Sequence, residues 1–114
     1  MPIENSSSPG NFKAALAKNK KVLVLYYWKD CGYCKSFFPI WSQVVQNYAD
    51  KLHIVQIEWD VIKRMNINDR ITSFPTIAAF KNGQLVSYMS SKRNDKNLEK
   101  FISTTFFPKQ PKKA

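Results

Sequence analysis

The sequence has few of the residues that staple small proteins or bind metals. It contains two cysteines, Cys31 and Cys34, and one histidine, His53. A disulfide-rich secreted scaffold carries more cysteine pairs at wider spacing. A structural zinc site needs four ligands, which two cysteines and one distant histidine do not supply. We therefore predict no metal site and no dissociable cofactor, and the two cysteines remain as a Cys-x-x-Cys pair.

Long apolar runs are also absent. The longest uncharged apolar run is Val22–Trp28, which is too short to cross a membrane. The first ten residues lack the basic region and apolar stretch of a secretory signal. We expect an intracellular, cytoplasmic monomer without membrane contact. A virion location would follow if the source were a large DNA virus, which the abundance of Lys, Asn and Ile also fits.

Acidic residues are scarce. Asp and Glu total 8 against 18 Lys and Arg, which gives a net charge of +10. Such a charge raises the local concentration of polyanions and acidic proteins. The codon bias of an AT-rich genome produces the same lysine excess. A nucleic-acid partner stays open on charge alone, because no aromatic platform or docking motif accompanies it.

The 114 residues suffice for one domain. We predict a flexible segment over 1–10, one domain over 11–107 and a basic tail over 108–114. Helical and strand patterns alternate along the domain, which predicts an α/β fold whose central mixed sheet of about four strands is flanked by helices. The expected helices cover about 11–18 (capped by Asn11), 34–49, 60–67 (capped by Asp60) and 95–107, and the expected strands cover 22–28, 53–59, 76–80 and 85–89.

The cysteine pair lies where a buried strand leads into a helix. At a helix N-terminus the free N–H groups and the helix dipole favour a thiolate at Cys31. Cys34, one turn further on, should be buried and keep its proton. Cys31 is then the nucleophile, and Cys34 is the resolving thiol that displaces the substrate from Cys31. Lys29 and Lys35 favour the Cys31 thiolate, whereas Asp30 opposes it.

Several motifs together resemble the thioredoxin superfamily over about residues 11–106. They are the sequence from Trp28 through Cys31-Gly-Tyr-Cys34 to Lys35, Pro39 inside the helix, Phe74-Pro75-Thr76, and Phe80-Lys-Asn-Gly83. The resemblance implies a thioredoxin-like fold and a cis peptide bond before Pro75. It also implies that the backbone of Phe74 pairs with the substrate. We expect Trp28 and Tyr33 to contact substrate as well.

The sequence departs from typical thioredoxins at several positions. Asp30 replaces the Trp before the first cysteine, and Tyr33 replaces the Pro between the cysteines. The buried acid and its lysine partner correspond here to Leu25 and Gln56. The Cys-Gly-Tyr-Cys motif is similar to that of disulfide isomerases. Arg93 resembles the arginine of protein disulfide isomerase modules that approaches the active site, so we expect Asp30, Lys35 and Arg93 to modulate the pair.

These observations predict a thiol–disulfide oxidoreductase that acts on protein disulfides or dithiols and is less reducing than a typical thioredoxin. The reductase, oxidase or isomerase direction stays open, as does the reductase or oxidase that recycles the pair. The alternative is a thioredoxin-like binding or assembly module with an acidic-protein or nucleic-acid partner and no essential redox turnover.

Overall fold

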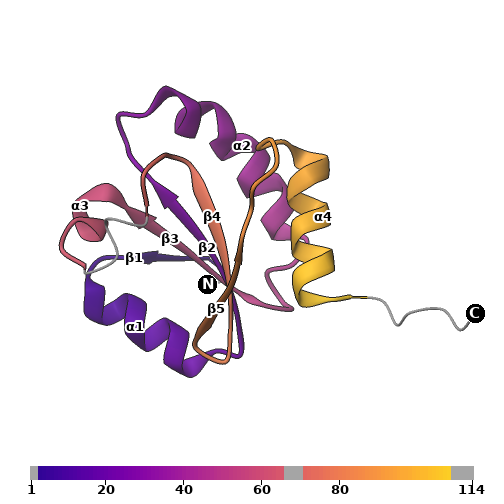
Figure 1. Cartoon of the computed structure of the whole chain (residues 1–114), viewed down its shortest axis with the longest axis horizontal. Helices are drawn as coiled ribbons and strands as arrows, with labels where there is room; N and C mark the ends of the chain where they lie inside the picture. Colours follow the sequence, from indigo (N-terminus) through magenta and orange to yellow (C-terminus); the bar gives the residue numbers. More distant parts are fainter. Residues whose placement is uncertain (1–2, 66–70, 109–114) are drawn as a thin grey trace, which may run out of the picture.

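The computed structural model describes residues 3–65 and 71–108, and its centre is a mixed five-stranded sheet (Figure 1). The strand order is β1-β3-β2-β4-β5. The first three are parallel, and β4 and β5 form an antiparallel hairpin at the edge. The predicted α/β fold with a mixed sheet is confirmed. The strands are β1 (Ile3–Ser6), β2 (Lys21–Tyr27), β3 (His53–Glu58), β4 (Thr76–Lys81) and β5 (Gln84–Tyr88).

The strand beyond the four that we expected is β1, and it lies within residues 1–10, the segment that we expected to be flexible. Residues 3–6 pair in parallel with residues 54–57 of β3, and Ser6 is buried. Backbone pairing with a sheet edge needs no apolar alternation, so the polar sequence around Ile3 gave little signal for it. The following helix begins at Pro9, because Ser8 rather than Asn11 is its N-cap. Residues 109–114 of the expected basic tail lie outside the described residues.

Helices cover both faces of the sheet (Figure 1). On one face lie α2 (Gly32–Gln46) and α4 (Asp95–Phe106), and on the other lie α1 (Pro9–Lys18) and α3 (Trp59–Ile62). Because both faces are covered, residues 22–26 of β2 are all buried. This explains why the sequence reads there as a continuous apolar run rather than an alternating one. The longest helix among the described residues, α2, is too short to cross a membrane.

Local capping sets the remaining boundaries. Glu58 rather than Asp60 caps α3, and Asn94 caps α4 through the backbone N–H of Asn97. Asn82 and Gly83 form the β4–β5 turn with φ angles of 53° and 80°. Both angles lie in the left-handed region that a two-residue hairpin turn requires, so the Asn-Gly signal predicted this hairpin correctly. Ile67, expected in the third helix, lies outside the described residues.

Candidate active site

Cys31 lies at the junction between β2 and α2. A turn leads out of the strand, with the backbone N–H of Cys31 donating to the carbonyl of Trp28 at 3.0 Å. Cys31 is then the N-cap of α2, and its Sγ accepts the backbone N–H of Cys34 at 3.3 Å. A helix N-terminus has free N–H donors, and one of them points here at the sulfur. This geometry stabilises negative charge that develops on the Cys31 sulfur.

Cys34 lies one turn deeper and is almost fully buried, with 2% of its surface exposed. Burial is the main cause that raises the pKa of the Cys34 thiol from 9.0 to about 12; the adjacent Cys31 sulfur acts in the same direction, and a backbone hydrogen bond at Trp28 opposes them. The thiol therefore stays protonated at neutral pH. Both cysteines are free thiols, and they differ in access because Cys31 remains partly exposed.

The loop that carries the pair is held by Glu58 at the end of β3. One oxygen of its carboxylate accepts the backbone N–H of Lys29 at 3.1 Å, and the other accepts the N–H of Asp60 at 2.8 Å. The carboxylate thus joins the start of α3 to the residues preceding Cys31. The sequence analysis missed this residue. The available signal was an acidic side chain at the end of a strand in a chain with few acids.

The loop before β4 approaches the cysteine pair from the other side. The Phe74–Pro75 peptide bond is cis, as the resemblance implied. The Sγ of Cys31 lies 3.6 Å from the carbonyl oxygen of Phe74. The Phe74 ring packs edge-on against Trp59 at 5.6 Å between ring centres. A chain bonded to the Cys31 sulfur would therefore lie beside the backbone of Phe74.

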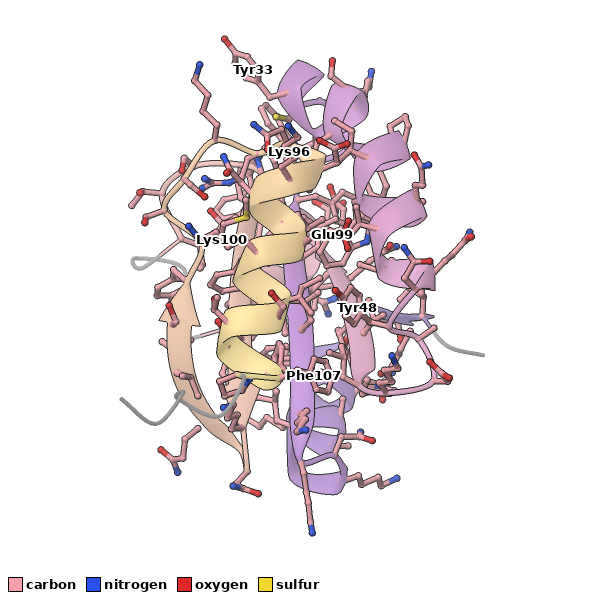
Figure 2. All side chains as sticks on the ribbon, turned by 90° about the vertical axis from the view of Figure 1, so that its right-hand side faces the viewer. Tyr33, Tyr48, Lys96, Glu99, Lys100 and Phe107 are labelled. Atoms are coloured by element: carbon pink, nitrogen blue, oxygen red, sulfur yellow. The ribbon has the colours of Figure 1, made fainter. Side chains whose placement is uncertain are left out.

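A groove of about 450 Å³ runs between the start of α2 and the loops before β4 and α4. Of the predicted site residues, Tyr33, Phe74, Pro75 and Arg93 line it. Tyr33 is 80% exposed and extends from the end of the molecule (Figure 2). The remaining lining residues, which the sequence analysis did not single out as site residues, are Ser36, Phe37, Ile40, Ser73, Lys92 and Asn94.

Three further predicted site residues, Trp28, Asp30 and Lys35, are exposed and do not line this groove. Trp28 is 40% exposed at the turn before Cys31. All three belong to the same loop and first helical turn as the cysteines. Contact of Trp28 with substrate therefore remains a prediction, as does modulation of the cysteine pair by Asp30 and Lys35.

Arg93 lies beside Pro75 at the rim of the groove. Its Nε donates to the carbonyl oxygen of Pro75 at 3.3 Å, and its Nη1 donates to the carbonyl oxygen of Ser91. The side chain is half-buried, and desolvation lowers its pKa, although a guanidinium stays charged at neutral pH. The two carbonyls fix the guanidinium against the loop that carries Phe74 and Pro75.

The positions that match the buried acid and its lysine partner hold neither charge. Leu25 is fully buried and lies opposite Gln56 in the parallel register of β2 and β3. The Gln56 side chain accepts the indole N–H of Trp41 at 2.7 Å and donates to the Asn5 side chain at 2.7 Å. The Gln56 amide is therefore hydrogen-bonded to two uncharged side chains. Within residues 3–65 and 71–108, no three His, Cys, Asp or Glu side chains gather closely enough to hold a metal.

The Thioredoxin family model matches residues 4–104, nearly the whole chain. The chain belongs to the thioredoxin family. Membership supports thiol–disulfide oxidoreductase activity as the general class of function, with Cys31 and Cys34 as the redox-active pair of the thioredoxin-like domain.

Three curated relatives and one solved structure show how this thioredoxin domain compares. Thioredoxin 1 of Plasmodium falciparum is 27% identical over 84% of this chain and 90% of its own length. A protein disulfide-isomerase of Drosophila melanogaster is 40% identical over 62% of this chain and 14% of its own length. A structure of P. falciparum thioredoxin matches 90% of this chain and 98% of its own at 25% identity, with a TM-score of 0.79. The chain also matches Bloodstream-specific protein 2 of Trypanosoma brucei brucei at 26% identity, over 86% of this chain and 20% of that protein's length.

Proposed function

We propose that this thioredoxin domain exchanges disulfides with protein substrates through Cys31 and Cys34. The observation that carries the proposal is the sulfur of Cys31 at the start of α2. It is partly exposed, accepts a helix N–H from Cys34 and lies beside the backbone of Phe74. The sulfur that attacks a substrate is thus accessible, and the sulfur that resolves the intermediate is buried one turn away.

The exchange proceeds in two displacements. The Cys31 thiolate attacks one sulfur of the substrate disulfide, and the other substrate sulfur leaves as a thiolate that takes a proton from water. Cys34 then loses its proton and attacks the Cys31 sulfur, which releases the second substrate thiolate. Two electrons pass from the pair to the substrate, and a Cys31–Cys34 disulfide remains. The reverse sequence oxidises a substrate dithiol.

We further propose that the pair is less reducing than a typical thioredoxin. Stabilisation of the reduced pair makes a dithiol a stronger oxidant, and here a helix N–H donates to the Cys31 sulfur of the reduced pair. Tyr33 stands between the cysteines where thioredoxins have a rigid proline, and Leu25 offers no acceptor for the Cys34 proton. Both features favour the dithiol form.

Equilibration with glutathione redox buffers tests this proposal. We expect a reduction potential above the value of about −270 mV that is typical of thioredoxin, and slow reduction of insulin. A potential as low as that of thioredoxin would refute the less reducing character. A C31S/C34S protein that retained full function in the host would refute exchange as the essential activity.

A second candidate function rests on a separate observation at the opposite end of the sheet. We call this region the basic end and define it as Lys18, Lys20, Lys21, Lys51 and Lys81. Lys20, Lys21 and Lys51 line one hollow of about 430 Å³, and Lys21 pairs directly opposite Lys81 across β2 and β4. Within the described ranges, none of the five forms an ion pair. Like charges opposite one another are unfavourable, so a bound anion would relieve the repulsion.

The chemistry of the basic end favours the phosphates of a nucleic acid as the partner. Its five cations are all lysine, and no Phe, Tyr or Trp lines the hollow. Protein interfaces are enriched in aromatic residues and arginine and depleted in lysine. A gel shift with random-sequence DNA at about 0.1 M salt tests the idea, because phosphate-driven binding should still be visible there and should weaken steeply as salt rises. No shift at that salt would refute this second function.

A further inference from the structure

The groove beside Cys31 is lined by positively charged side chains on the side away from the β2–α2 loop. Among the described residues, Lys92 and Arg93 are the charged residues of its lining, and no carboxylate contributes to it. The nearest acid in sequence, Asp95, is exposed, and its carboxylate accepts the backbone N–H of Lys96 in the first turn of α4. The other walls are apolar or hydroxylic, from Phe37, Ile40, Ser36 and Ser73. The groove is therefore a cationic pocket with an apolar floor.

The guanidinium of Arg93 has unused donors in this pocket. Arginine carries five N–H groups, of which one on Nε and one on Nη1 reach the carbonyls of Pro75 and Ser91. No carboxylate of the described residues lies within salt-bridge distance of it. A half-buried cation without a counter-ion is unfavourable, and burial already lowers its pKa. A guanidinium fixed in this way is preorganised to bind a carboxylate in a bidentate fashion.

The pocket also lies where a substrate must pass. Phe74 and Pro75 contribute to its wall, and the Cys31 sulfur lies 3.6 Å from the Phe74 carbonyl. Arg93 touches the next residue of that wall, at the Pro75 carbonyl. Figure 2 shows Tyr33 at the same end of the molecule as Lys96 in the first turn of α4, and Tyr33 is 80% exposed. A polypeptide joined to Cys31 would lie within reach of the guanidinium.

We propose that the preferred substrates are polypeptides that carry an Asp or Glu within a few residues of the reacting cysteine, and that Arg93 binds this carboxylate. The inference rests on the proposed exchange function and names its substrate class. The opposite side of the site has mixed charge, with Asp60 contacting both Lys29 and Lys63. The preference therefore comes from the α4 side of the groove. Arg93 is in this account a specificity-determining residue, and the chemistry stays with Cys31 and Cys34.

A matched series of peptides tests the proposal. Each peptide carries one cysteine activated as a mixed disulfide with 2-thiopyridine, and the position two residues before or after it is Glu, Gln or Lys. The Cys31 thiolate of the reduced protein attacks the peptide sulfur and releases the neutral, coloured thione, so one single-turnover rate constant is obtained for each peptide. For at least one of the two positions we expect the Glu peptide to react about fivefold faster than the Gln peptide, as one well-placed charge pair allows, and the Lys peptide to react most slowly.

Variants assign the preference to its residue. In R93Q the ratio of the rate constants for the Glu and Gln peptides, the Glu-to-Gln ratio, should fall to about one. R93K should keep part of this preference because a point charge remains. K51Q at the basic end is the matched control and should keep the full ratio. The ratio should also shrink at high salt. A modulating effect of Arg93 on the cysteines would change all peptides equally and leave the ratio intact.

The outcomes separate the two proposals. If the wild-type protein releases thione from no peptide, the exchange function itself fails. If it reacts with every peptide at a Glu-to-Gln ratio near one, exchange stands and the acidic preference is wrong. A ratio that survives R93Q refutes the assignment to Arg93. The wild-type ratio needs no variant, so the preference is tested even if R93Q does not fold.

Discussion

The two ends of the sheet present positive charge to solvent in different ways. At the end that carries Cys31, which we call the redox end, Lys92 and Arg93 lie beside an apolar groove. Arg93 is half-buried there and donates hydrogen bonds to backbone carbonyls. At the basic end, three of the five lysines line a polar hollow together with Asp50, and none of the five forms an ion pair within the described residues. A fixed guanidinium beside apolar walls suits one carboxylate in one place, whereas flexible lysines suit a repeating polyanion. Positive charge presented in these two ways therefore predicts two kinds of ligand.

The two ends lie about 20 Å apart along β2, as expected for a strand of this length. Lys21 begins the strand, and the cysteine loop follows its last residue. At physiological salt this distance exceeds the length over which exposed charges interact. The comparison therefore predicts that each end can be changed without altering the other.

The largest effect is expected from the cysteines. C31S should reduce exchange to the level of the buffer, because it removes the accessible thiol and leaves the buried thiol of Cys34. C34S should still attack, but it should accumulate the mixed disulfide, because no second thiol resolves it. Mass spectrometry of the protein incubated with a disulfide peptide distinguishes the two. Both variants should bind DNA as the wild type does. A loss of DNA binding in C31S would contradict the independence of the two ends.

The next effect concerns the basic end. Replacing Lys18, Lys20, Lys51 and Lys81 by Gln should abolish the gel shift at about 0.1 M salt and flatten the salt dependence, because fewer counterions are released. The rate of exchange with the Gln peptide should not change.

K81Q alone should stabilise the fold by about 0.2–1 kcal/mol, because it removes the repulsion with Lys21 across the strands. Chemical denaturation measures that shift, and a destabilised K81Q would contradict the repulsion argument.

The interior between the two ends offers a third prediction. L25D places a carboxylate in a fully buried position and should destabilise the protein by about 3–5 kcal/mol. In L25D/Q56K the new acid gains a partner, so part of that loss should return. The double variant should also resolve mixed disulfides faster at neutral pH, because Cys34 gains a proton acceptor. L25N is the control of similar size, and equal resolution rates in L25N and L25D/Q56K would exclude the acceptor role.

The last effect is a pH dependence of stability that is expected only at alkaline pH. The folded reduced protein holds the Cys34 proton up to a pKa of about 12, whereas an ordinary thiol loses it near 9.0. The unfolded state therefore binds fewer protons above pH 9, and the free energy of unfolding should fall as pH rises from about 9 towards 12. The difference between wild type and C34A, measured by denaturation across that range, isolates this thiol from the buried tyrosines. A difference that does not change with pH would contradict the buried, protonated Cys34.

Much of the site could be predicted because its signals are local. The buried run from Val22, the Cys31–Cys34 spacing at a strand-to-helix junction and the Asn82–Gly83 turn each depend on neighbours in sequence. The spacing of apolar side chains and the residue preferences of turns depend on a few neighbouring residues, so both can be recognised in the sequence without knowledge of the fold. The resemblance added the cis bond at Pro75 and the absence of the buried acid at Leu25.

The remaining features depend on contacts between distant segments. The sequence by itself determined an α/β chain with one cysteine of the Cys-x-x-Cys pair at a helix start and its buried partner one turn later. Only the tertiary structure paired β1 with β3, aimed Glu58 at the loop before Cys31 and set Arg93 on the Pro75 carbonyl. It also gathered five separated lysines at one end. These arrangements follow from strand order and loop closure, which one-dimensional periodicity does not encode.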